Sequence, residues 1–302
     1  MYDIIIIGAG TAGLSAAIYG RRSGKNVLVI EKLSYGGQII NTPEIENYPG
    51  IQKISGFEFA TALNKQAKDL GAEIVSGDVT SVSANGPDNA SFKVVTNKAE
   101  YEGSKVIIAT GSKNRPLGLE HEKEWIGKGI SYCATCDGMF FRGKTVAVAG
   151  GGNTALEDAA FLSNYCEKVY LIHRRNELRG EQKLQDNLRE KENVEFVLNV
   201  AIDGIDGQDR LSSINVSDKE TGEKRNIPID GLFIAIGQMP QNEVFVPLVE
   251  LDDKGYIIAG EDCKTKTPGV YAAGDCRTKE VRQLTTAAAD GAVAALAASK
   301  DV

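Results

Sequence analysis

The sequence contains two copies of one unit, made of an apolar strand, a glycine-rich turn, a helix and a second strand. The apolar run Tyr2–Ile7 leads into Gly8-Ala9-Gly10-Thr11-Ala12-Gly13, and the run Lys144–Ala149 leads into Gly150-Gly151-Gly152-Asn153-Thr154-Ala155. Continuous apolar runs are typical of parallel strands buried on both faces. Glycines at these points allow a tight turn, let backbone amides approach a pyrophosphate and let helix and strand pack closely. The repeat predicts an α/β fold with two Rossmann-like (doubly wound) nucleotide-binding domains.

Each copy continues in the same order. We expect helices over Thr11–Arg22 and Asn153–Asn164, with Asn153 able to cap the second, and following strands over Asn26–Glu31 and Lys168–His173. An alanine-rich helix is expected over Thr285–Lys300. Its N-terminal amides would stabilise negative charge on a nearby group.

Further buried strands indicate that one domain is inserted into the other. Three apolar runs end at a glycine turn, namely Val106–Gly111, Gly231–Gly237 and Val270–Asp275. The chain is therefore divided into a discontinuous first domain, residues 1–114 and 243–302, and a second domain, residues 115–242. The proline-containing segments Lys113–Pro116 and Met239–Asn242 are the candidate hinge strands.

Bulk composition excludes several classes of protein. The chain has 302 residues, a net charge of -7 and no run of Lys or Arg that would indicate a nucleic-acid or membrane partner. Ile4–Ile7 is too short for a signal peptide, and no window approaches the roughly 20 apolar residues that span a bilayer. Five cysteines with one close pair favour a cytoplasmic protein over a secreted disulfide framework. No metal site is predicted.

The two nucleotide sites differ at the end of the second strand. Glu31 stands 23 residues after Gly8, where a carboxylate suits ribose hydroxyls. His173 stands 23 residues after Gly150 and is followed by three arginines, Arg174, Arg175 and Arg179. Guanidinium groups bind a ribose 2′-phosphate, which a carboxylate would repel. The first site therefore suits FAD or NAD and the second NADPH; the alternative for the arginines is a solvated basic cluster.

Between the two turns lies Cys133-Ala134-Thr135-Cys136-Asp137, which we interpret as a redox-active dithiol. A zinc pair would need two more Cys or His at suitable spacing, and a structural disulfide closing so short a loop would stabilise little. Asp137 is the candidate acid–base group for the departing thiolate. Its alternative role is the N-cap of a segment starting at Gly138. The other cysteines are expected to be unpaired, with Cys166 on a helix and Cys263 in a loop. Cys276 directly follows Asp275 and would lie close to a flavin bound in the first nucleotide site.

A chain with two nucleotide sites and one dithiol requires a carrier between a hydride donor and thiols. Nicotinamide gives up two electrons at once, and a flavin can accept them and reduce a disulfide. FAD in the first site and NADPH in the second complete the route.

Together these residues resemble low-molecular-weight thioredoxin reductase, a class II pyridine nucleotide-disulfide oxidoreductase. The resemblance extends from residue 4 to residue 291, and its matching elements are Gly36-Gly37-Gln38, Glu46-Asn47-Tyr48-Pro49-Gly50, Ala109-Thr110-Gly111, Ser131–Gly138, His173-Arg174-Arg175 with Arg179, Ala273-Gly274-Asp275 and Arg282-Gln283. Placing the thiols inside the nicotinamide domain distinguishes this family from glutathione-reductase-like enzymes, whose pair lies near the N-terminus.

The resemblance implies a role for each element. Cys136 would face the flavin C4a carbon, Cys133 would attack the thioredoxin disulfide, and Asp137 would be the acid–base residue. Asp275 would bind the ribityl chain. The residues predicted to bind the two cofactors are Gly8, Gly10, Thr11, Ala12, Gly13, Glu31, Gly37, Gln38, Asn47, Val79, Ala109, Thr110, Gly111, Gly274, Asp275, Arg282, Gln283 and Leu284 for FAD, and Gly150, Gly152, Asn153, Thr154, His173, Arg174, Arg175, Arg179, Ile236 and Gly237 for NADPH.

The resemblance also implies a homodimer, thioredoxin as partner, and rotation of the nicotinamide domain between half-reactions, because a dithiol and a nicotinamide cannot share one flavin face. Three alternatives stay open at this point. A relative serving a peroxiredoxin is disfavoured because Met1 directly precedes the first strand, and a ferredoxin-fed relative should lack the arginines near His173. A flavin-binding regulator without turnover is disfavoured by Cys133, Cys136 and Asp137.

Overall fold

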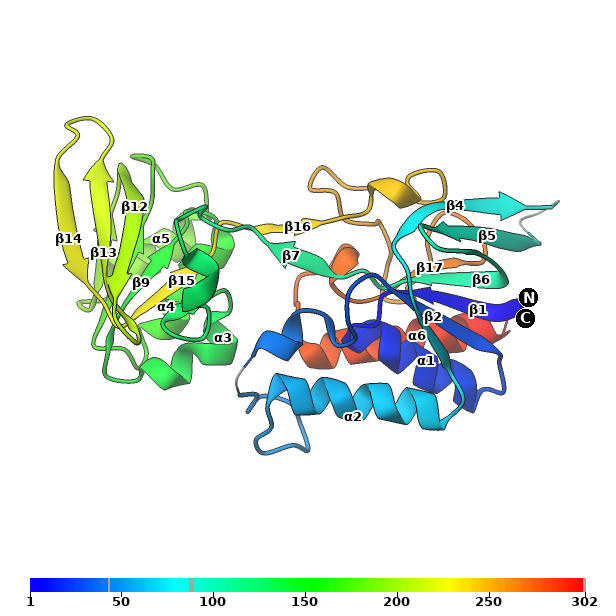
Figure 1. Cartoon of the computed structure of the whole chain (residues 1–302). Helices are drawn as coiled ribbons and strands as arrows, with labels where there is room; N and C mark the ends of the chain where they lie inside the picture. The colour runs from blue at the N-terminus through cyan, green and yellow to red at the C-terminus, as the bar shows by residue number, and fades with distance from the viewer. Residues whose placement is uncertain (43, 87–89, 301–302) are drawn as a thin grey trace. The chain divides into compact units, whose positions relative to one another are not determined.

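The structure is a computed structural model that describes residues 1–42, 44–86 and 90–300. Its internal contacts divide the chain into two compact units (Figure 1), unit 1 made of Met1–Lys113 and Met239–Val302, and unit 2 made of Asn114–Gln238. The chain passes between them twice, and the two crossing segments, β7 (Ser112–Asn114) and β16 (Gln238–Pro240), pair as a two-stranded sheet. These strands overlap the segments in which hinge strands were expected.

Unit 1 is built on a seven-stranded sheet in the order β3-β2-β1-β6-β5-β4, with β17 also pairing with β6. Its strands are β1 (Tyr2–Ile7), β2 (Val27–Glu31), β3 (Glu73–Ser76), β4 (Val79–Asn85), β5 (Ser91–Thr96), β6 (Glu100–Ile108) and β17 (Val270–Ala272). The pairs around β1 and the β17–β6 pair are parallel, whereas β4, β5 and β6 form an antiparallel meander. The helices α1 (Thr11–Arg22), α2 (Gly56–Asp69) and α6 (Leu284–Lys300) lie on one face of the parallel strands (Figure 1).

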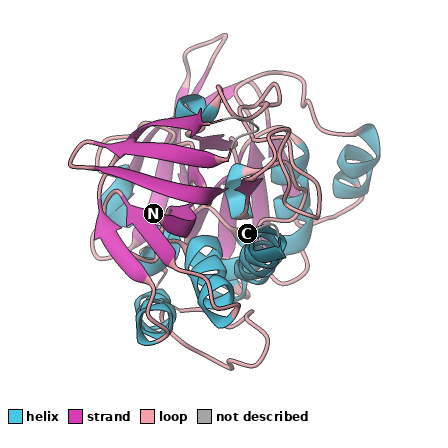
Figure 2. Cartoon of the chain, turned by 90° about the vertical axis from the view of Figure 1, so that its right-hand side faces the viewer, coloured by secondary structure: helices cyan, strands magenta, loops and turns pink. Residues whose placement is uncertain are grey.

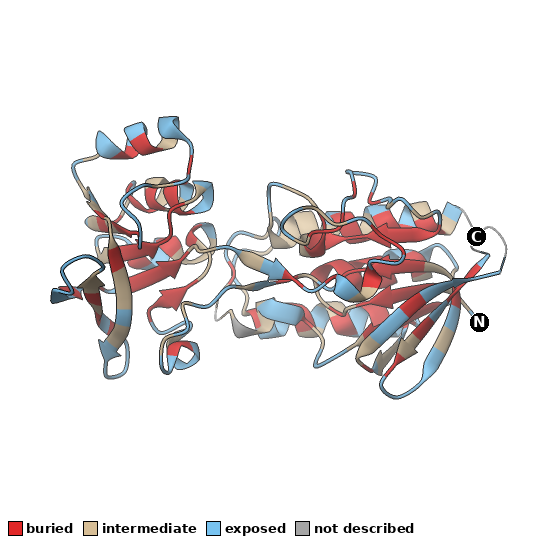
Figure 3. Cartoon of the chain, turned by 90° about the horizontal axis from the view of Figure 1, so that it is seen from above, coloured by how far each residue is buried: buried red, intermediate tan, exposed pale blue. Residues whose placement is uncertain are grey.

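Both faces of β1 are covered, which explains its continuous apolar sequence. Ile4 and Ile6 belong to the core shared with α1 and α6, and Ile5 and Ile7 belong to the core on the opposite face. Alternate residues of a strand point to opposite faces, so every side chain from Ile4 to Ile7 is buried. Figure 3 shows the same concentration of buried residues in the strands of this unit.

Unit 2 contains a five-stranded parallel sheet, in the order β11-β10-β9-β15-β8, and a separate antiparallel sheet, β12-β13-β14. The strands are β8 (Ile130–Ser131), β9 (Thr145–Ala149), β10 (Lys168–Ile172), β11 (Val194–Val197), β12 (Val200–Gly207), β13 (Leu211–Asp218), β14 (Lys224–Pro228) and β15 (Gly231–Ile234). Figure 2 colours the strands of the chain magenta and its helices cyan. Its helices are α3 (Ala134–Asp137), α4 (Asn153–Leu162) and α5 (Gln182–Arg189). The unit β9-turn-α4-β10 repeats β1-turn-α1-β2, as the sequence predicted.

Two local predictions in unit 2 are wrong. The helix expected to reach Asn164 ends at Leu162, so Cys166 lies beyond α4 instead of on it. Asn153 does not cap α4, because the N-cap position is Gly152 and no side-chain cap bond forms. The Asn153 amide instead accepts a hydrogen bond from the Glu181 backbone N–H (2.8 Å).

Within the part of the chain that the structure describes, no helix combines the length and the apolar character that crossing a membrane requires.

Candidate active site

The two cysteines of the predicted dithiol form a disulfide in unit 2. Cys133 precedes the short helix α3 and Cys136 lies inside it, and their Cα atoms are 5.3 Å apart. The Cys133 carbonyl accepts backbone hydrogen bonds from Cys136 and Asp137 (3.3 and 3.1 Å), which closes the turn that brings the sulfurs together. Both cysteines are partly exposed, so another thiol can reach them. The described residues contain no cluster of three His, Cys, Asp or Glu placed to hold a metal ion.

Asp137 follows the disulfide and is positioned by Ser131, which lies in β8. The Ser131 hydroxyl donates to Asp137 Oδ2 (2.6 Å), while Oδ1 is buried with no hydrogen-bond partner among the described residues. Burial raises the pKa of this carboxyl group, and the Ser131 hydroxyl opposes the rise. Asp137 does occupy the N-cap position of the segment at Gly138, the alternative role, but its side chain makes no cap bond there. A partly buried carboxyl group with a raised pKa, next to a disulfide, is suited to proton transfer.

A second carboxylate, on Glu122, fixes the chain just before the disulfide. It is buried and accepts hydrogen bonds from the Tyr132 hydroxyl (2.6 Å) and from the backbone N–H groups of Leu117, Gly118 and Leu119. Sequence reasoning missed this residue, because Glu122 and Tyr132 are ten positions apart and neither shows a pattern pointing to the other.

In unit 1 the glycines of the first turn let backbone segments pack closely and leave space for a ligand beside the backbone. A Cβ on Gly8, whose φ is +106°, or on Gly13 would overlap backbone atoms, whereas no described atom lies within 4 Å of a Cβ built on Gly10. The backbone at Gly10 therefore faces open space at the start of α1, where a diphosphate is favoured. Glu31, at the end of β2, accepts hydrogen bonds from the backbone N–H groups of Ala9 (2.7 Å) and Leu33 (2.9 Å). A carboxylate has about four acceptor positions, so Glu31 keeps capacity for ribose hydroxyls.

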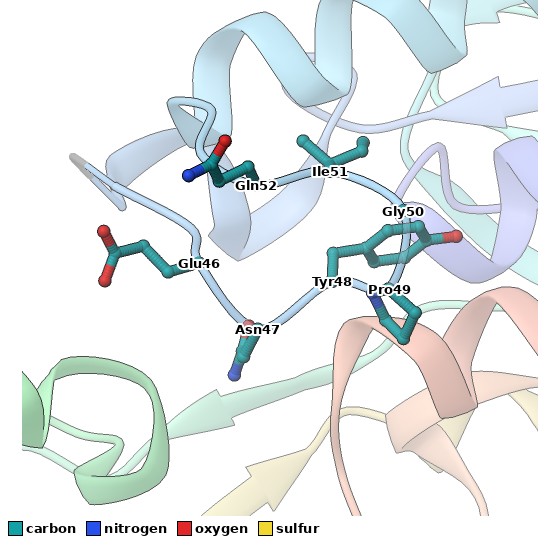
Figure 4. Close-up of a pocket in the computed structure, with 7 residues that line it drawn as sticks. All are labelled: Glu46, Asn47, Tyr48, Pro49, Gly50, Ile51 and Gln52. Atoms are coloured by element: carbon teal, nitrogen blue, oxygen red, sulfur yellow. The ribbon is translucent and has the colours of Figure 1, made fainter.

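Among the other predicted residues, Gly36 and Gly37 lie against this turn. The Gly36 N–H donates to the Ala9 carbonyl (2.7 Å), and a Cβ on Gly37 would stand 3.4 Å from Gly10 Cα. The Gln38 amide donates to the Ser112 carbonyl, and the Asn47 amide donates to Gln283 Oε1 (3.3 Å), 236 positions away. Asn47 also belongs to a pocket whose lining residues follow one another around a single loop (Figure 4), namely Glu46, Asn47, Tyr48, Pro49, Gly50, Ile51 and Gln52.

The segment after β17 supplies polar atoms that no described residue pairs. Asp275 Oδ1 and Arg282 Nε are both buried and have no hydrogen-bond partner among the described residues. Burial raises the pKa of Asp275, and the positive charges of Lys279 and Arg282 oppose the rise. The Arg282 guanidinium lies 4.2 Å from the centre of the Tyr256 ring. These unpaired groups fit a polar ligand such as the ribityl chain of a flavin.

The other predicted residues of unit 1 fall at strand and helix ends. Val79 begins β4, Leu284 begins α6, and Ala109-Thr110-Gly111 follows β6. Gly111 has a φ of +67°, and no described atom lies within 4 Å of a Cβ built on it. Thr11 and Ala12 are buried at the start of α1, and Ala12 lies against Gly274.

The second glycine turn is arranged differently in unit 2. His173 is buried beneath the turn, where a Cβ on Gly151 would overlap its imidazole ring. Burial, together with Arg179, Arg175 and Arg174, lowers the pKa of His173, and its Nε2 has no partner among the described residues.

The three arginines near this turn are exposed, and the Arg179 N–H donates to the Gly151 carbonyl (2.6 Å). No described atom lies within 4 Å of a Cβ built on Gly152. The last predicted residues lie beside the turn, with Thr154 in α4 and Ile236-Gly237 after β15. The turn thus has open backbone at Gly152 and exposed positive charges available for an anionic ligand.

Comparisons with known proteins agree with this geometry. The family described as pyridine nucleotide-disulphide oxidoreductase matches residues 2–291. A thioredoxin reductase of Listeria innocua is 41% identical over 304 aligned residues, which cover 100% of this chain and 94% of the relative. The chain belongs to the thioredoxin reductase family. Membership implies a flavin and a pyridine nucleotide as cofactors.

Two solved members of the thioredoxin reductase family extend the match to structure. The enzyme of Streptococcus pyogenes has a TM-score of 0.93 and 39% identity, covering 99% of this chain and 97% of that one. The enzyme of Lactococcus lactis in its FR conformation has a TM-score of 0.67 and 38% identity, covering 99% and 98%. The disulfide between Cys133 and Cys136 fits the redox-active cysteine pair of a thioredoxin reductase.

Proposed function

We propose that this protein is an NADPH-dependent thioredoxin reductase in which FAD connects the nicotinamide to the Cys133–Cys136 disulfide. The observation that carries the proposal is that disulfide. It lies beside Asp137, whose Oδ1 is buried, in a unit whose glycine turn is flanked by exposed arginines. Over one cycle NADPH, a proton and the thioredoxin disulfide give NADP⁺ and the thioredoxin dithiol. Two electrons and two protons reach sulfur, so the reaction balances.

The residues of unit 1 are proposed to hold FAD. The backbone at Gly10 would receive the diphosphate, Glu31 the adenosine ribose, and Asp275 Oδ1 the ribityl hydroxyls. Asp275 Oδ1 has no partner among the described residues, which supports this assignment, because a buried polar atom without a partner is costly unless a ligand satisfies it. Bound FAD would accept the hydride and pass the electron pair to the disulfide.

The dithiol residues have separate tasks. Cys133, which precedes α3, is proposed to attack the thioredoxin disulfide, and Cys136 to face the flavin. Asp137 would hold the proton that the departing thiolate needs, since burial keeps its pKa above the usual range. Replacing Cys133 by Ser should leave flavin reduction by NADPH intact and abolish thioredoxin reduction.

NADPH rather than NADH is proposed as the donor, because Arg174, Arg175 and Arg179 are exposed beside the second glycine turn. Replacing Arg175 and Arg179 by Ala removes two charge-assisted contacts to a 2′-phosphate and should raise the KM for NADPH by at least about tenfold. The KM for NADH should change little. Arg210→Ala, an exposed arginine between β12 and β13, is the matched control. A ferredoxin-fed enzyme would instead show no flavin bleaching with NADPH under anaerobic conditions.

Rotation of unit 2 between the two half-reactions is part of the proposal. It is supported by the relatives themselves, since two enzymes with nearly equal identity and coverage give TM-scores of 0.93 and 0.67. Such a spread is expected when like domains differ in arrangement. A disulfide engineered to fix the units should allow one half-reaction and stop turnover; full turnover of the fixed form would refute rotation.

A homodimer in the cytoplasm completes the proposal. The buried free cysteines Cys166, Cys263 and Cys276 suit a reducing compartment. Sedimentation of the purified protein tests the dimer, and a single species of about 32.3 kDa would refute it.

A further inference from the structure

Asp290 is a buried carboxylate inside α6, a helix that is otherwise mostly alanine and other small residues. A buried charge requires strong partners. Asp290 Oδ2 accepts hydrogen bonds from Arg277 Nε (2.8 Å), Lys279 Nζ (2.9 Å) and the Gly274 backbone N–H (2.9 Å), and Oδ1 accepts one from Arg277 Nη2 (2.8 Å). One carboxylate therefore gathers four donors from the segment 274–279.

The donors are themselves enclosed by the protein. The Arg277 side chain is 1% exposed, and its Nη1 also donates to the carbonyls of Ala259 (3.3 Å) and Thr278 (2.9 Å). The Lys279 side chain is 6% exposed. These contacts hold the pKa of Asp290 below its usual value although burial acts to raise it. Asp290 is thus charged, and the position of its carboxylate is fixed by hydrogen bonds from Gly274, Arg277 and Lys279.

The neighbouring residue of α6 joins the cluster to the first glycine turn. A Cβ on Gly291 would overlap the Ala12 carbonyl oxygen, so α6 and α1 are in direct backbone contact there. Gly274, with a φ of +78°, lies so close to Ala12 that an added Cβ would stand 2.8 Å from the Ala12 Cβ. Asp290 and Gly291 therefore fix the segment containing Gly274 against the start of α1.

The cluster also sets the charge around Asp275. Arg277 and Lys279 together carry one more charge than Asp290 neutralises, and Lys279 is the largest positive influence on the Asp275 carboxyl group. Glu261 contacts Arg277 (3.3 Å) only from the surface, since its side chain is 94% exposed. Lys279 thus acts on the pKa of Asp275 in the opposite direction to Asp290, whose negative charge raises it, and Asp275 Oδ1 has no partner among the described residues.

We propose that Asp290 is a positioning residue for the flavin site, which holds the Gly274 amide and the Lys279 ammonium in the arrangement that prepares Asp275 to bind FAD. The inference rests on the FAD site proposed above. Asp290 itself does not touch the cofactor; it acts through Gly274 and Lys279. The sequence carries no signal for this role, because a single Asp in an alanine-rich helix has no motif around it.

The test measures FAD binding by apoprotein, without turnover. Asp290→Asn keeps the shape of the side chain but removes its charge, so the dissociation constant for FAD should rise at least about tenfold, as expected from losing charged hydrogen bonds. The visible absorption bands of the FAD that still binds should move toward those of free flavin. Glu261→Gln, which alters the exposed partner of the same arginine, should bind FAD as the wild type does.

Each outcome separates this inference from the function it rests on. If wild-type apoprotein does not bind FAD, the proposed function fails. If wild type binds and a folded Asp290→Asn variant binds with equal affinity and an unchanged spectrum, the positioning role is wrong. If Asp290→Asn does not fold, Lys279→Met decides, since it keeps the Arg277–Asp290 pair: a several-fold weaker FAD affinity supports the role, and unchanged affinity overturns it.

Discussion

The hydrogen bond from Ser131 to Asp137 makes a direct prediction about proton transfer at the disulfide. The Ser131 hydroxyl is the group that donates to Asp137 Oδ2, at 2.6 Å, and Oδ1 is buried without a partner among the described residues. Ser131→Ala removes that donor from a buried carboxylate. The ionised form loses its stabilisation while the protonated form loses little, so the pKa of Asp137, already raised by burial, should rise further.

The size of the shift follows from the strength of the bond. A hydrogen bond to a charged group contributes about 1.5–3 kcal/mol. One pKa unit corresponds to about 1.36 kcal/mol, so the pKa of Asp137 should rise by roughly one to two units. Ser131 also accepts a hydrogen bond from the Cys133 N–H (3.1 Å), so the variant loosens the same turn without touching either sulfur.

The assay is the pH dependence of kcat/KM for thioredoxin, which reports groups of the free enzyme. The limb assigned to Asp137 should move to higher pH in Ser131→Ala, return toward its original position in Ser131→Thr, and disappear in Asp137→Asn. A Ser131→Ala profile that superimposes on the wild type, or one displaced to lower pH, would refute the reasoning. Persistence of the limb in Asp137→Asn would show that another group titrates there.

Three further predictions concern stability. Burial, with a smaller effect of Glu157, raises the pKa of Asp158 to about 7. The folded state therefore holds the proton of Asp158 more tightly than the unfolded state does, so the free energy of unfolding falls as pH rises from about 4 to 7. Asp158→Asn should remove this loss, raising stability at pH 8 by up to ~4 kcal/mol relative to wild type in urea unfolding, and an identical pH dependence in both proteins would contradict it. Gly291→Ala should lower the free energy of unfolding by about 1–3 kcal/mol, because the added Cβ overlaps α1. Its control is Gly260→Ala, where a Cβ meets only Asp262 Oδ1 at 3.5 Å and the melting temperature should not change. Equal melting temperatures of the two variants would count against the close contact between α1 and α6. Glu122→Gln should cost at least ~2 kcal/mol in thermal unfolding, because a neutral amide cannot accept all four donors, and the exposed Glu124→Gln is its control; a loss no larger than that of the control would be inconsistent with the proposed anchoring.

Much of the fold was predictable because its signals are local. Tyr2–Ile7 and Lys144–Ala149 are buried on both faces, and the glycines that follow are needed where backbone atoms come within contact distance. These features depend on residues that are consecutive in the chain, so the sequence pattern indicates them directly. The antiparallel sheet β12-β13-β14 was not predicted, since its strands alternate buried and exposed positions only weakly.

In the candidate site, too, the features set by neighbouring residues could be predicted and those set by distant residues could not. Cys133 and Cys136 could be paired from their spacing, since only a short turn separates them. Asn153 was expected to cap α4, but Glu181, brought close by the tertiary fold, provides its partners instead. A side chain that can serve either a local or a distant backbone group follows whichever the packing supplies.

The sequence by itself determined the parallel strands at the centre of two sheets, two glycine turns and one thiol pair, because each is signalled by residues within a few positions of the chain. Only the tertiary structure decided which charges are buried together. The fold brings Glu122 to Tyr132, and Asp290 to Arg277 and Lys279, although these residues lie in different parts of the chain. It also buries Asp275 Oδ1 where no described residue pairs with it. The energy of a buried charge is set by every group around it, and that surrounding exists only once the chain has folded.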